Sequence, residues 1–178
     1  MELNDQAREA FFHQDYAPRQ RIDGVEIVEL RRFHDDGGAI TELGRLDRGA
    51  HQALEGFEVR QVNFSEVEPG VVKAYHMHHR QTDVWYVPPS DKMLVVLHDC
   101  RKGSPTEGTT MRLVLGNGTS RLLRIPPGVA HGCTNLGRDV ARIIYMVDVQ
   151  FSADPDATDE GRLPWDYLGE EIWRMQHG

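Results

Sequence analysis

Between residues 57 and 149 the chain is divided into short apolar runs by turns rich in glycine and proline, and this pattern constrains the fold more than any other feature. The clearest turns are Pro69-Gly70, Pro88-Pro89, Gly116-Asn117-Gly118 and Pro126-Pro127-Gly128. Each run between them has the length and the residue types of a β-strand. Many short strands at regular spacing predict an all-β barrel or a jelly roll.

The expected strands are rich in β-branched and aromatic residues, and several alternate apolar with polar positions. They cover residues 25–30, 40–43, 58–64, 71–76, 84–87, 92–97, 110–115, 120–125 and 140–149. At Trp85-Tyr86, strand alternation predicts that one ring fills the core while the other faces outward. Residues 34–39 are expected to form a turn, and residues 44–56 and 152–162 are expected to be surface loops.

The two ends of the chain are expected to differ from the barrel. Residues 1–20 are predicted to form a polar N-terminal arm with a short helix capped by Asn4, and residues 21–178 a single domain. The segment from Leu163 to Met175 carries two tryptophans and is expected to pack on the barrel as a short amphipathic helix. A chain of 178 residues is long enough for one domain with a substantial core.

The composition excludes several classes of partner. The formal net charge is −8, which disfavours nucleic acid and anionic membranes, because both attract basic surfaces. No apolar run approaches the roughly 20 residues that cross a bilayer, and the polar, acidic N-terminus is unlike a signal peptide. Cys100 and Cys133 are too few for a disulfide framework, so a reduced cytoplasmic protein is expected.

Two segments far apart in the sequence carry the side chains most suited to chemistry. Residues 70–83 read G-x5-H-x-H-x4-D, and residues 126–135 read P-x-G-x2-H-x3-N. Because side chains alternate along a strand, His76 and His78 point to the same side. A small barrel would bring His131 to them, since the inward residues of several strands share one interior.

At these residues the chain resembles a cupin, and within the cupins it resembles the dTDP-4-dehydrorhamnose 3,5-epimerase family. The segments that carry this resemblance are QVNFS (61–65), GVVKAYH (70–76), HDCRKGSPTEG (98–108), IPPGVAHG (125–132) and IIYMVDV (143–149). The part around Arg101, Ser104 and Pro105 is the most specific. The match runs from about residue 57 to residue 174, and a weaker match covers residues 23–43.

The resemblance implies both a fold and an activity. The fold would be an all-β double-stranded β-helix, the jelly-roll cupin barrel, with short terminal helices, and the protein would be a homodimer built by strand exchange. The family's enzymes act on a dTDP-4-keto-6-deoxy sugar in deoxysugar biosynthesis. A histidine removes the proton next to the ketone and a tyrosine returns a proton on the other face, without a cofactor.

Carried over by position, the resemblance implies that His76 is the base and Tyr145 the acid. The residues expected to contact the substrate are Gln61, Asn63, Lys73 and His131. Tyr145 follows His131 by one residue more than is usual in the family, and a one-residue slip would turn its side chain to the wrong face. An extra residue within the turn at 136–139 would preserve the orientation of Tyr145.

Several positions depart from the family pattern. Gly37-Gly38-Ala39-Ile40 stands where the family has Arg-Gly-Phe-Phe, and Asp83 stands where it has a lysine beside the ketone oxygen. A carboxylate cannot stabilise an enolate directly. The sequence also ends at Gly178, before the family's segment with the aspartate that orients the catalytic histidine.

The same departures favour a second hypothesis. His76, His78, Asp83 and His131 together form a three-histidine, one-carboxylate set, which suits a divalent transition metal such as Zn, Ni, Fe or Mn. The alternatives to a sugar-nucleotide epimerase are therefore a metal-dependent cupin acting on another small carbonyl or hydroxy compound, and a barrel that binds a sugar nucleotide without turning it over.

Overall fold

Two five-stranded antiparallel sheets face each other in the computed structural model, which describes residues 2–14, 17, 20–154 and 157–176. The β8 sheet has the order β1 (Glu26–Glu29), β11 (Arg121–Ile125), β8 (Asp83–Tyr86), β13 (Ala141–Val147) and β6 (Gln61–Val67). The β7 sheet has the order β10 (Thr110–Gly116), β9 (Lys92–Asp99), β12 (Val129–Asn135), β7 (Val72–His78) and β14 (Glu160–Arg162).

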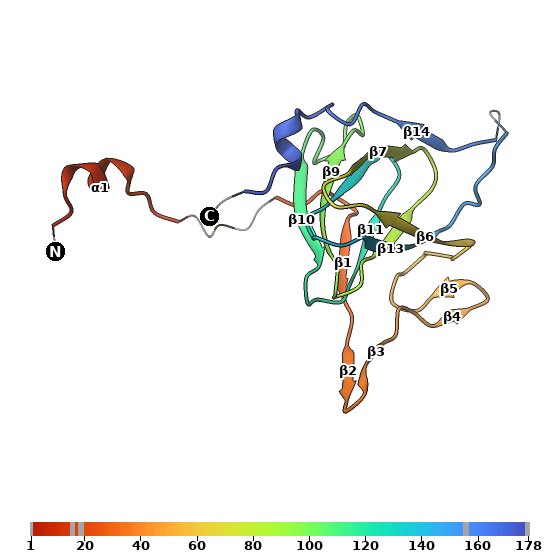
Figure 1. Cartoon of the computed structure of the whole chain (residues 1–178). Helices are drawn as coiled ribbons and strands as arrows, with labels where there is room; N and C mark the ends of the chain where they lie inside the picture. Colours follow the sequence, from red (N-terminus) through yellow and green to blue (C-terminus); the bar gives the residue numbers. More distant parts are fainter. Residues whose placement is uncertain (1, 15–16, 18–19, 155–156, 177–178) are drawn as a thin grey trace.

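From β6 to β14 the chain passes to the opposite sheet at almost every connection, and only β9 and β10 are consecutive strands of one sheet. This connectivity gives a barrel whose neighbouring strands come from distant parts of the sequence (Figure 1). The predicted jelly-roll fold is thereby confirmed. Strands β7 and β12 are paired so that His76 lies opposite His131, which joins the two histidine segments.

The main core fills the space between the sheets, and Trp85, Leu97, Leu123 and Ile143 are among its buried members. Strand β8 is buried on both faces, because a second cluster containing Leu54, Phe57 and Tyr86 covers its outer side. The prediction that either Trp85 or Tyr86 would face outward is therefore wrong. Alternation assigns two faces to a strand, but it does not reveal that another segment covers the second face.

That covering segment was expected to be a surface loop. Residues 44–56 instead include the short strands β4 (Leu46–Asp47) and β5 (Ala50–His51), and their buried residue Leu54 packs beneath Phe57 against the β8 sheet. A separate hairpin pairs β2 (Arg32–Asp35) with β3 (Gly38–Thr41) and projects from the barrel (Figure 1). The predicted return strand at 40–43 thus pairs with β2 rather than with residues 25–30, which pair with β11.

Near the C-terminus, two expectations need correction. Residues 152–162 are more than a surface loop, because they end in β14, which pairs with β7. The helix expected from Leu163 to Met175 is limited to the 3-10 turn η1 (Glu170–Trp173). Its buried Trp173 packs against Tyr75 with ring centroids 5.2 Å apart, while the indole Nε1 donates a hydrogen bond to the carbonyl of Trp165.

At the N-terminus, helix α1 (Asp5–Ala10) begins as the sequence predicts: Oδ1 of Asn4 accepts a hydrogen bond from the backbone N–H of Ala7. The helix lies away from the barrel (Figure 1). Part of the predicted arm, at residues 1, 15–16 and 18–19, is outside the described residues. Among the helices described, none is both long and apolar enough to cross a bilayer.

The segment around Arg101, Ser104 and Pro105, which carries the most specific part of the family resemblance, has a structural role. Buried Asp99 accepts hydrogen bonds from the side chains of Arg101, Ser104 and Thr106 at 2.7–2.8 Å. Arg101 also donates to the carbonyl of Asp23, whose N–H donates to Thr106. The hydrogen bonds from Arg101 are the main cause of a lowered pKa for Asp99. This network ties the loop after β9 to the chain entering β1.

Candidate active site

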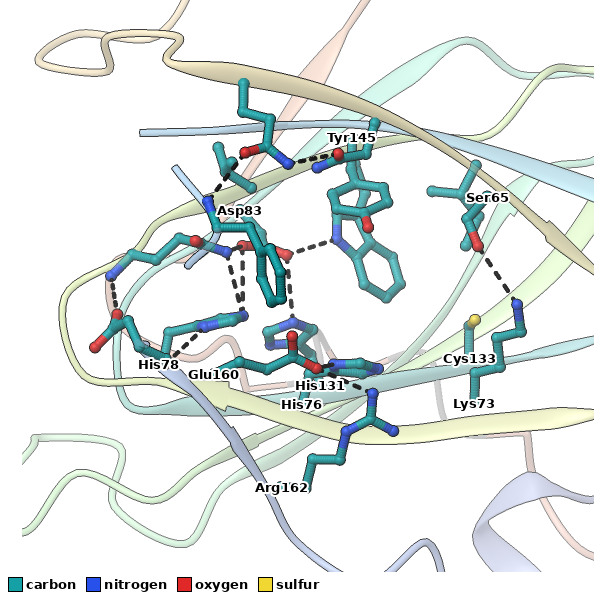
Figure 2. Close-up of a pocket in the computed structure, with 18 of the residues that line it drawn as sticks. Ser65, Lys73, His76, His78, Asp83, His131, Cys133, Tyr145, Glu160 and Arg162 are labelled. Atoms are coloured by element: carbon teal, nitrogen blue, oxygen red, sulfur yellow. Dashed lines mark hydrogen bonds and ion pairs between the residues drawn. The ribbon is translucent and has the colours of Figure 1, made fainter. Parts of the chain in front are cut away.

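A cavity of about 680 Å³ lies inside one end of the barrel and is lined by both sheets. The β7 sheet contributes His76, His78 and His131, and the β8 sheet contributes Asp83 and Tyr145. Figure 2 shows these side chains converging from opposite walls. The prediction that two remote segments aim imidazoles into one cavity therefore agrees with the structure, in which the rings of His76 and His131 stack at 6.1 Å.

His76 is paired with an acidic residue that sequence analysis missed. Glu160 of β14 lies with Oε1 3.2 Å from Nδ1 of His76, and Arg162 donates to the same oxygen at 3.0 Å. Burial, followed by the positive neighbours His131 and Arg162, lowers the pKa of His76 to about 4, against the opposing effect of Glu160. The imidazole of His76 is therefore uncharged at neutral pH, as a general base must be.

Tyr145 faces the cavity from the wall opposite to His76 (Figure 2). In the β8 sheet it lies beside Trp85 and Asn63, its partners on β8 and β6. The extra residue between His131 and Tyr145 therefore does not turn the phenol away from the site. Burial is the main cause of a raised pKa for Tyr145, with Asp83 and Glu160 adding to it, so the hydroxyl keeps its proton at neutral pH.

The remaining predicted contacts lie on the same walls. Gln61 and Asn63 line the cavity from β6, where Nε2 of Gln61 donates to Oδ1 of Asn63 at 2.7 Å. Lys73 lines the cavity from β7, but its ammonium group donates to the backbone carbonyl of Glu66 and to the hydroxyl of Ser65. Lys73 therefore needs to exchange these contacts before it can bind an anion directly.

Three buried residues form a separate group beside His76. Nε2 of His131 lies 3.5 Å from Oδ2 of Asp83, and Nε2 of His78 lies 3.7 Å from Oδ1. Trp85 and Gln81 both donate hydrogen bonds to Asp83. Burial alone would raise the pKa of Asp83, but the attraction of His131, with that of His78 and Gln81, outweighs it and lowers the pKa to about 2.

The four residues predicted to form one metal set are thus divided in two. His78, Asp83 and His131 offer ligand atoms that all lie within 4.8 Å of one another, and His76 is not part of this group. Glu160 and Arg162 gave little signal in the sequence, since they occur in a three-residue strand after an acidic, turn-rich stretch. Their role becomes visible only when this stretch is seen to pair with β7.

Comparison with known proteins identifies the relatives of this chain. The sequence model of the dTDP-4-dehydrorhamnose 3,5-epimerase family matches residues 19–166, which includes the N-terminal hairpin. The spore coat polysaccharide biosynthesis protein SpsL of Bacillus subtilis is 41% identical over 145 residues, or 82% of this chain and 91% of that protein.

Two solved structures have the same fold. The dTDP sugar isomerase from Desulfovibrio desulfuricans is 31% identical, with a TM-score of 0.72 over 83% of this chain and 88% of that one. The dTDP-6-deoxy-D-glucose-3,5-epimerase from Legionella pneumophila, in complex with dTDP-4-keto-L-rhamnose, is 27% identical, with a TM-score of 0.69 over 86% and 78%.

The jelly-roll barrel, together with the match to the epimerase family model and to a solved dTDP sugar isomerase, defines a cupin-type carbohydrate epimerase. More particularly, the chain belongs to the dTDP-4-dehydrorhamnose 3,5-epimerase family. This membership favours the epimerase prediction over both alternatives, the metal-dependent cupin acting on an unrelated substrate and the barrel that only binds a sugar nucleotide.

Proposed function

We propose that this protein epimerises a nucleotide-linked 4-keto-6-deoxy sugar, most closely a dTDP-4-keto-6-deoxy sugar, at a carbon next to the ketone. The observation that carries this proposal is the position of His76 and Tyr145 on opposite sheets, both facing one cavity. Epimerisation needs a base on one face of the sugar ring and an acid on the other, and two facing walls meet that requirement.

His76 is the proposed base. Its Nδ1 is directed at Glu160, so Nε2 is the nitrogen that accepts the proton from carbon. The resulting imidazolium is stabilised by the carboxylate of Glu160, which Arg162 holds in position and keeps ionised. Glu160 thus supplies the carboxylate that orients the imidazole of His76. The ketone accepts the electrons of the broken C–H bond as an enolate.

Tyr145 is the proposed acid, because its raised pKa keeps the hydroxyl protonated until the enolate forms. Proton return from the Tyr145 side inverts the carbon and leaves a phenolate that regains its proton from solvent. One proton leaves the sugar and one is added, so the reaction needs no redox cofactor. Gln61, Asn63 and the cations Lys73 and Arg162 line the cavity and offer contacts to a sugar and its diphosphate.

The cavity volume of about 680 Å³ is in the range of small-molecule sites and exceeds the needs of a lone hexose. We infer that the nucleotide occupies the outer part of the cavity. A cytoplasmic location is part of the same proposal, since Cys100 and Cys133 are both free thiols and sugar nucleotides are cytoplasmic metabolites.

A homodimer is the third part of the proposal. The β2–β3 hairpin projects from the barrel with Ile40 69% exposed, and the edge strand β6 has Phe64 62% exposed on its outer face. An isolated two-stranded hairpin is marginally stable on its own. A second copy of the chain that accepts this hairpin would cover both apolar surfaces, in keeping with strand exchange.

Deuterium exchange tests the activity. The protein is incubated in deuterated water with dTDP-4-keto-6-deoxyglucose, and the product is analysed by NMR and mass spectrometry. Deuterium entering C3 or C5, the two carbons next to the ketone, is expected from wild type and from His79→Gln, an exposed control, and is expected to be absent from His76→Gln. Wild type that incorporates no deuterium would contradict the proposed activity.

A further inference from the structure

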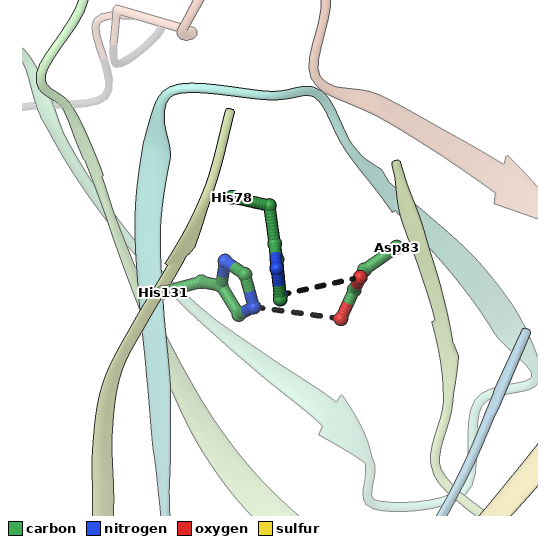
Figure 3. A group of neighbouring side chains, drawn as sticks. All are labelled: His78, Asp83 and His131. Carbon is green, nitrogen blue, oxygen red and sulfur yellow. Dashed lines mark ion pairs between the residues drawn. The ribbon is translucent and has the colours of Figure 1, made fainter. Parts of the chain in front are cut away.

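The mechanism above leaves His78, Asp83 and His131 unused, although they are among the most buried polar residues of the site. Their side chains are 8%, 5% and 2% exposed, respectively. They come from three strands of both sheets, β7, β8 and β12 (Figure 3). Buried charged and polar groups persist when they are paired, hydrogen-bonded or bound to a metal.

The hydrogen bonds of the two imidazoles fix which nitrogen carries a proton. Nδ1 of His131 lies 3.0 Å from the carbonyl of Val129, and Nδ1 of His78 lies 3.0 Å from the carbonyl of Asp159. A carbonyl oxygen can only accept, so each Nδ1 is the donor. In the neutral rings both Nε2 atoms therefore present lone pairs, and both face the carboxylate of Asp83.

Three acceptors that face one another leave a space suited to a cation, which the Gln81 amide fills in part by donating to two of them. We propose that Nε2 of His78, Nε2 of His131 and the carboxylate of Asp83 bind one divalent first-row transition metal ion. Such ions take imidazole and carboxylate ligands at about 2.0–2.2 Å, which separates neighbouring ligand atoms in a tetrahedron by about 3.3 Å. The observed separations are near this value, at 3.5 Å from His131 to Oδ2 of Asp83 and 3.7 Å from His78 to Oδ1, and one ligand atom from each residue lies within 4.8 Å of the others.

The surroundings of these three residues match those of a metal site. Ligating histidines usually donate their second nitrogen to a carbonyl or a carboxylate, as His78 and His131 do here. Trp85 donates to Oδ2 of Asp83 at 3.1 Å and thereby orients the carboxylate. With only three protein ligands, a tetrahedral ion keeps an open position, as catalytic sites do.

One side chain must move when the ion binds. Nε2 of Gln81 lies 2.7 Å from Oδ1 of Asp83 and 3.3 Å from Nε2 of His78, so the amide stands beside the proposed position. Gln81 lies in the short turn between β7 and β8 and is half-buried, which leaves it room to rotate. The competing occupant is the Gln81 amide itself, which already donates to Asp83 and lies beside His78.

A metal here would bring positive charge to a cavity whose lining includes the carboxylates of Asp83, Asp159 and Glu160. For the proposed epimerisation, that charge is available to stabilise the enolate oxygen, a role that a carboxylate cannot perform. This consequence rests on the proposed function, whereas the binding site itself does not. The two are separable, because His76 and Glu160 are not ligands.

The test measures bound metal directly. Full-length protein is prepared without chelator, exposed in turn to Zn²⁺, Mn²⁺, Fe²⁺, Ni²⁺ and Co²⁺, freed of excess ion, and analysed for metal per chain. About one equivalent of at least one ion is expected in wild type. The Co²⁺ form is expected to show visible absorption bands, and metal binding is expected to raise the melting temperature.

Matched variants locate the ion. His78→Gln and Asp83→Asn are expected to lower the bound metal about tenfold or more. His76→Gln and His79→Gln are expected to retain it, while His76→Gln loses proton exchange, which separates the metal site from the catalytic base. Circular dichroism establishes that each variant folds. Wild type that holds less than about a tenth of an equivalent of every ion would overturn the proposal in favour of the Gln81 amide as the occupant. Equal metal content in wild type and Asp83→Asn would also overturn it.

Discussion

Oε1 of Glu160 lies 3.2 Å from Nδ1 of His76, across the pairing of β14 with β7. The two residues are 84 positions apart in the sequence, and Arg162 binds the same carboxylate oxygen. This contact separates the polar residues of the cavity into two groups. One is the proposed base His76 with its acidic partner Glu160. The other is the buried set of His78, Asp83 and His131, whose atoms could bind a metal ion.

Replacing Glu160 with Gln should lower kcat about 10–100-fold with little change in KM, because the imidazolium formed during proton removal loses its carboxylate partner. Glu160→Asp should restore part of the activity. Steady-state kinetics of the three proteins provides the measurement. A Glu160→Gln enzyme that matches wild type in kcat would show that this carboxylate does not assist the base.

Replacing Tyr145 with Phe should separate exchange from inversion. His76 can still remove the proton and return deuterium from the same side, but the opposite face has lost its acid. We expect net epimerisation to fall by roughly 100-fold or more while deuterium exchange into the unchanged sugar continues. NMR distinguishes the two products. Equal losses of exchange and inversion would argue that the phenol is needed before the proton is removed.

Replacing Asp99 with Asn should destabilise the protein by about 3 kcal/mol at pH 7, because the Arg101 guanidinium loses the negative charge that balances its own. The folded-state pKa of Asp99 is lowered, so its contribution to stability is present above the unfolded pKa of about 3.9 and is lost as the pH falls below it. Urea unfolding of wild type and variant between pH 7 and pH 3 measures both effects.

The matched control for Asp99 is Asp47→Asn, at an exposed position of β4. Its stability should stay within about 0.5 kcal/mol of wild type at every pH. If Asp99→Asn were as stable as wild type at pH 7, the ionic network after β9 would have no net stabilising effect. A decline with acid that is as steep in the variant as in wild type would assign the pH dependence to other carboxylates.

Replacing Ile40 with Glu should weaken the proposed dimer. A charge on the apolar face of the projecting hairpin would have to be buried against the second copy, at a cost of several kcal/mol. Light scattering coupled to gel filtration should report a dimer for wild type and a monomer, or a concentration-dependent mixture, for the variant. A wild-type protein that is monomeric at micromolar concentration would contradict the proposed assembly.

Sequence analysis predicted the contact of His76 with His131 because their spacing on separate strands leaves few folds that serve both segments. The position of Asp83 in the same cavity was predictable for the same reason. Glu160 was not, because three residues of an edge strand are too few to show a period. Tyr86 was misjudged because its burial depends on Leu54, which belongs to a segment without a recognisable pattern.

The network around Asp99 illustrates a different limit. The residues that resemble the epimerase family most specifically, Arg101 and Ser104, are tied to a buried carboxylate and do not line the cavity. The proposed base His76 and acid Tyr145 match the family, whereas His78 and Asp83 depart from it and could be interpreted only from their contacts.

Strand β14 is attached to the barrel along one side only, through its pairing with β7. The carboxylate that serves the base therefore sits on a peripheral ribbon whose detachment costs far less than melting the barrel. Activity should consequently be lost at a lower temperature than the one at which the barrel unfolds. A ligand that contacts Arg162 would stabilise the attached position of β14 and delay this inactivation.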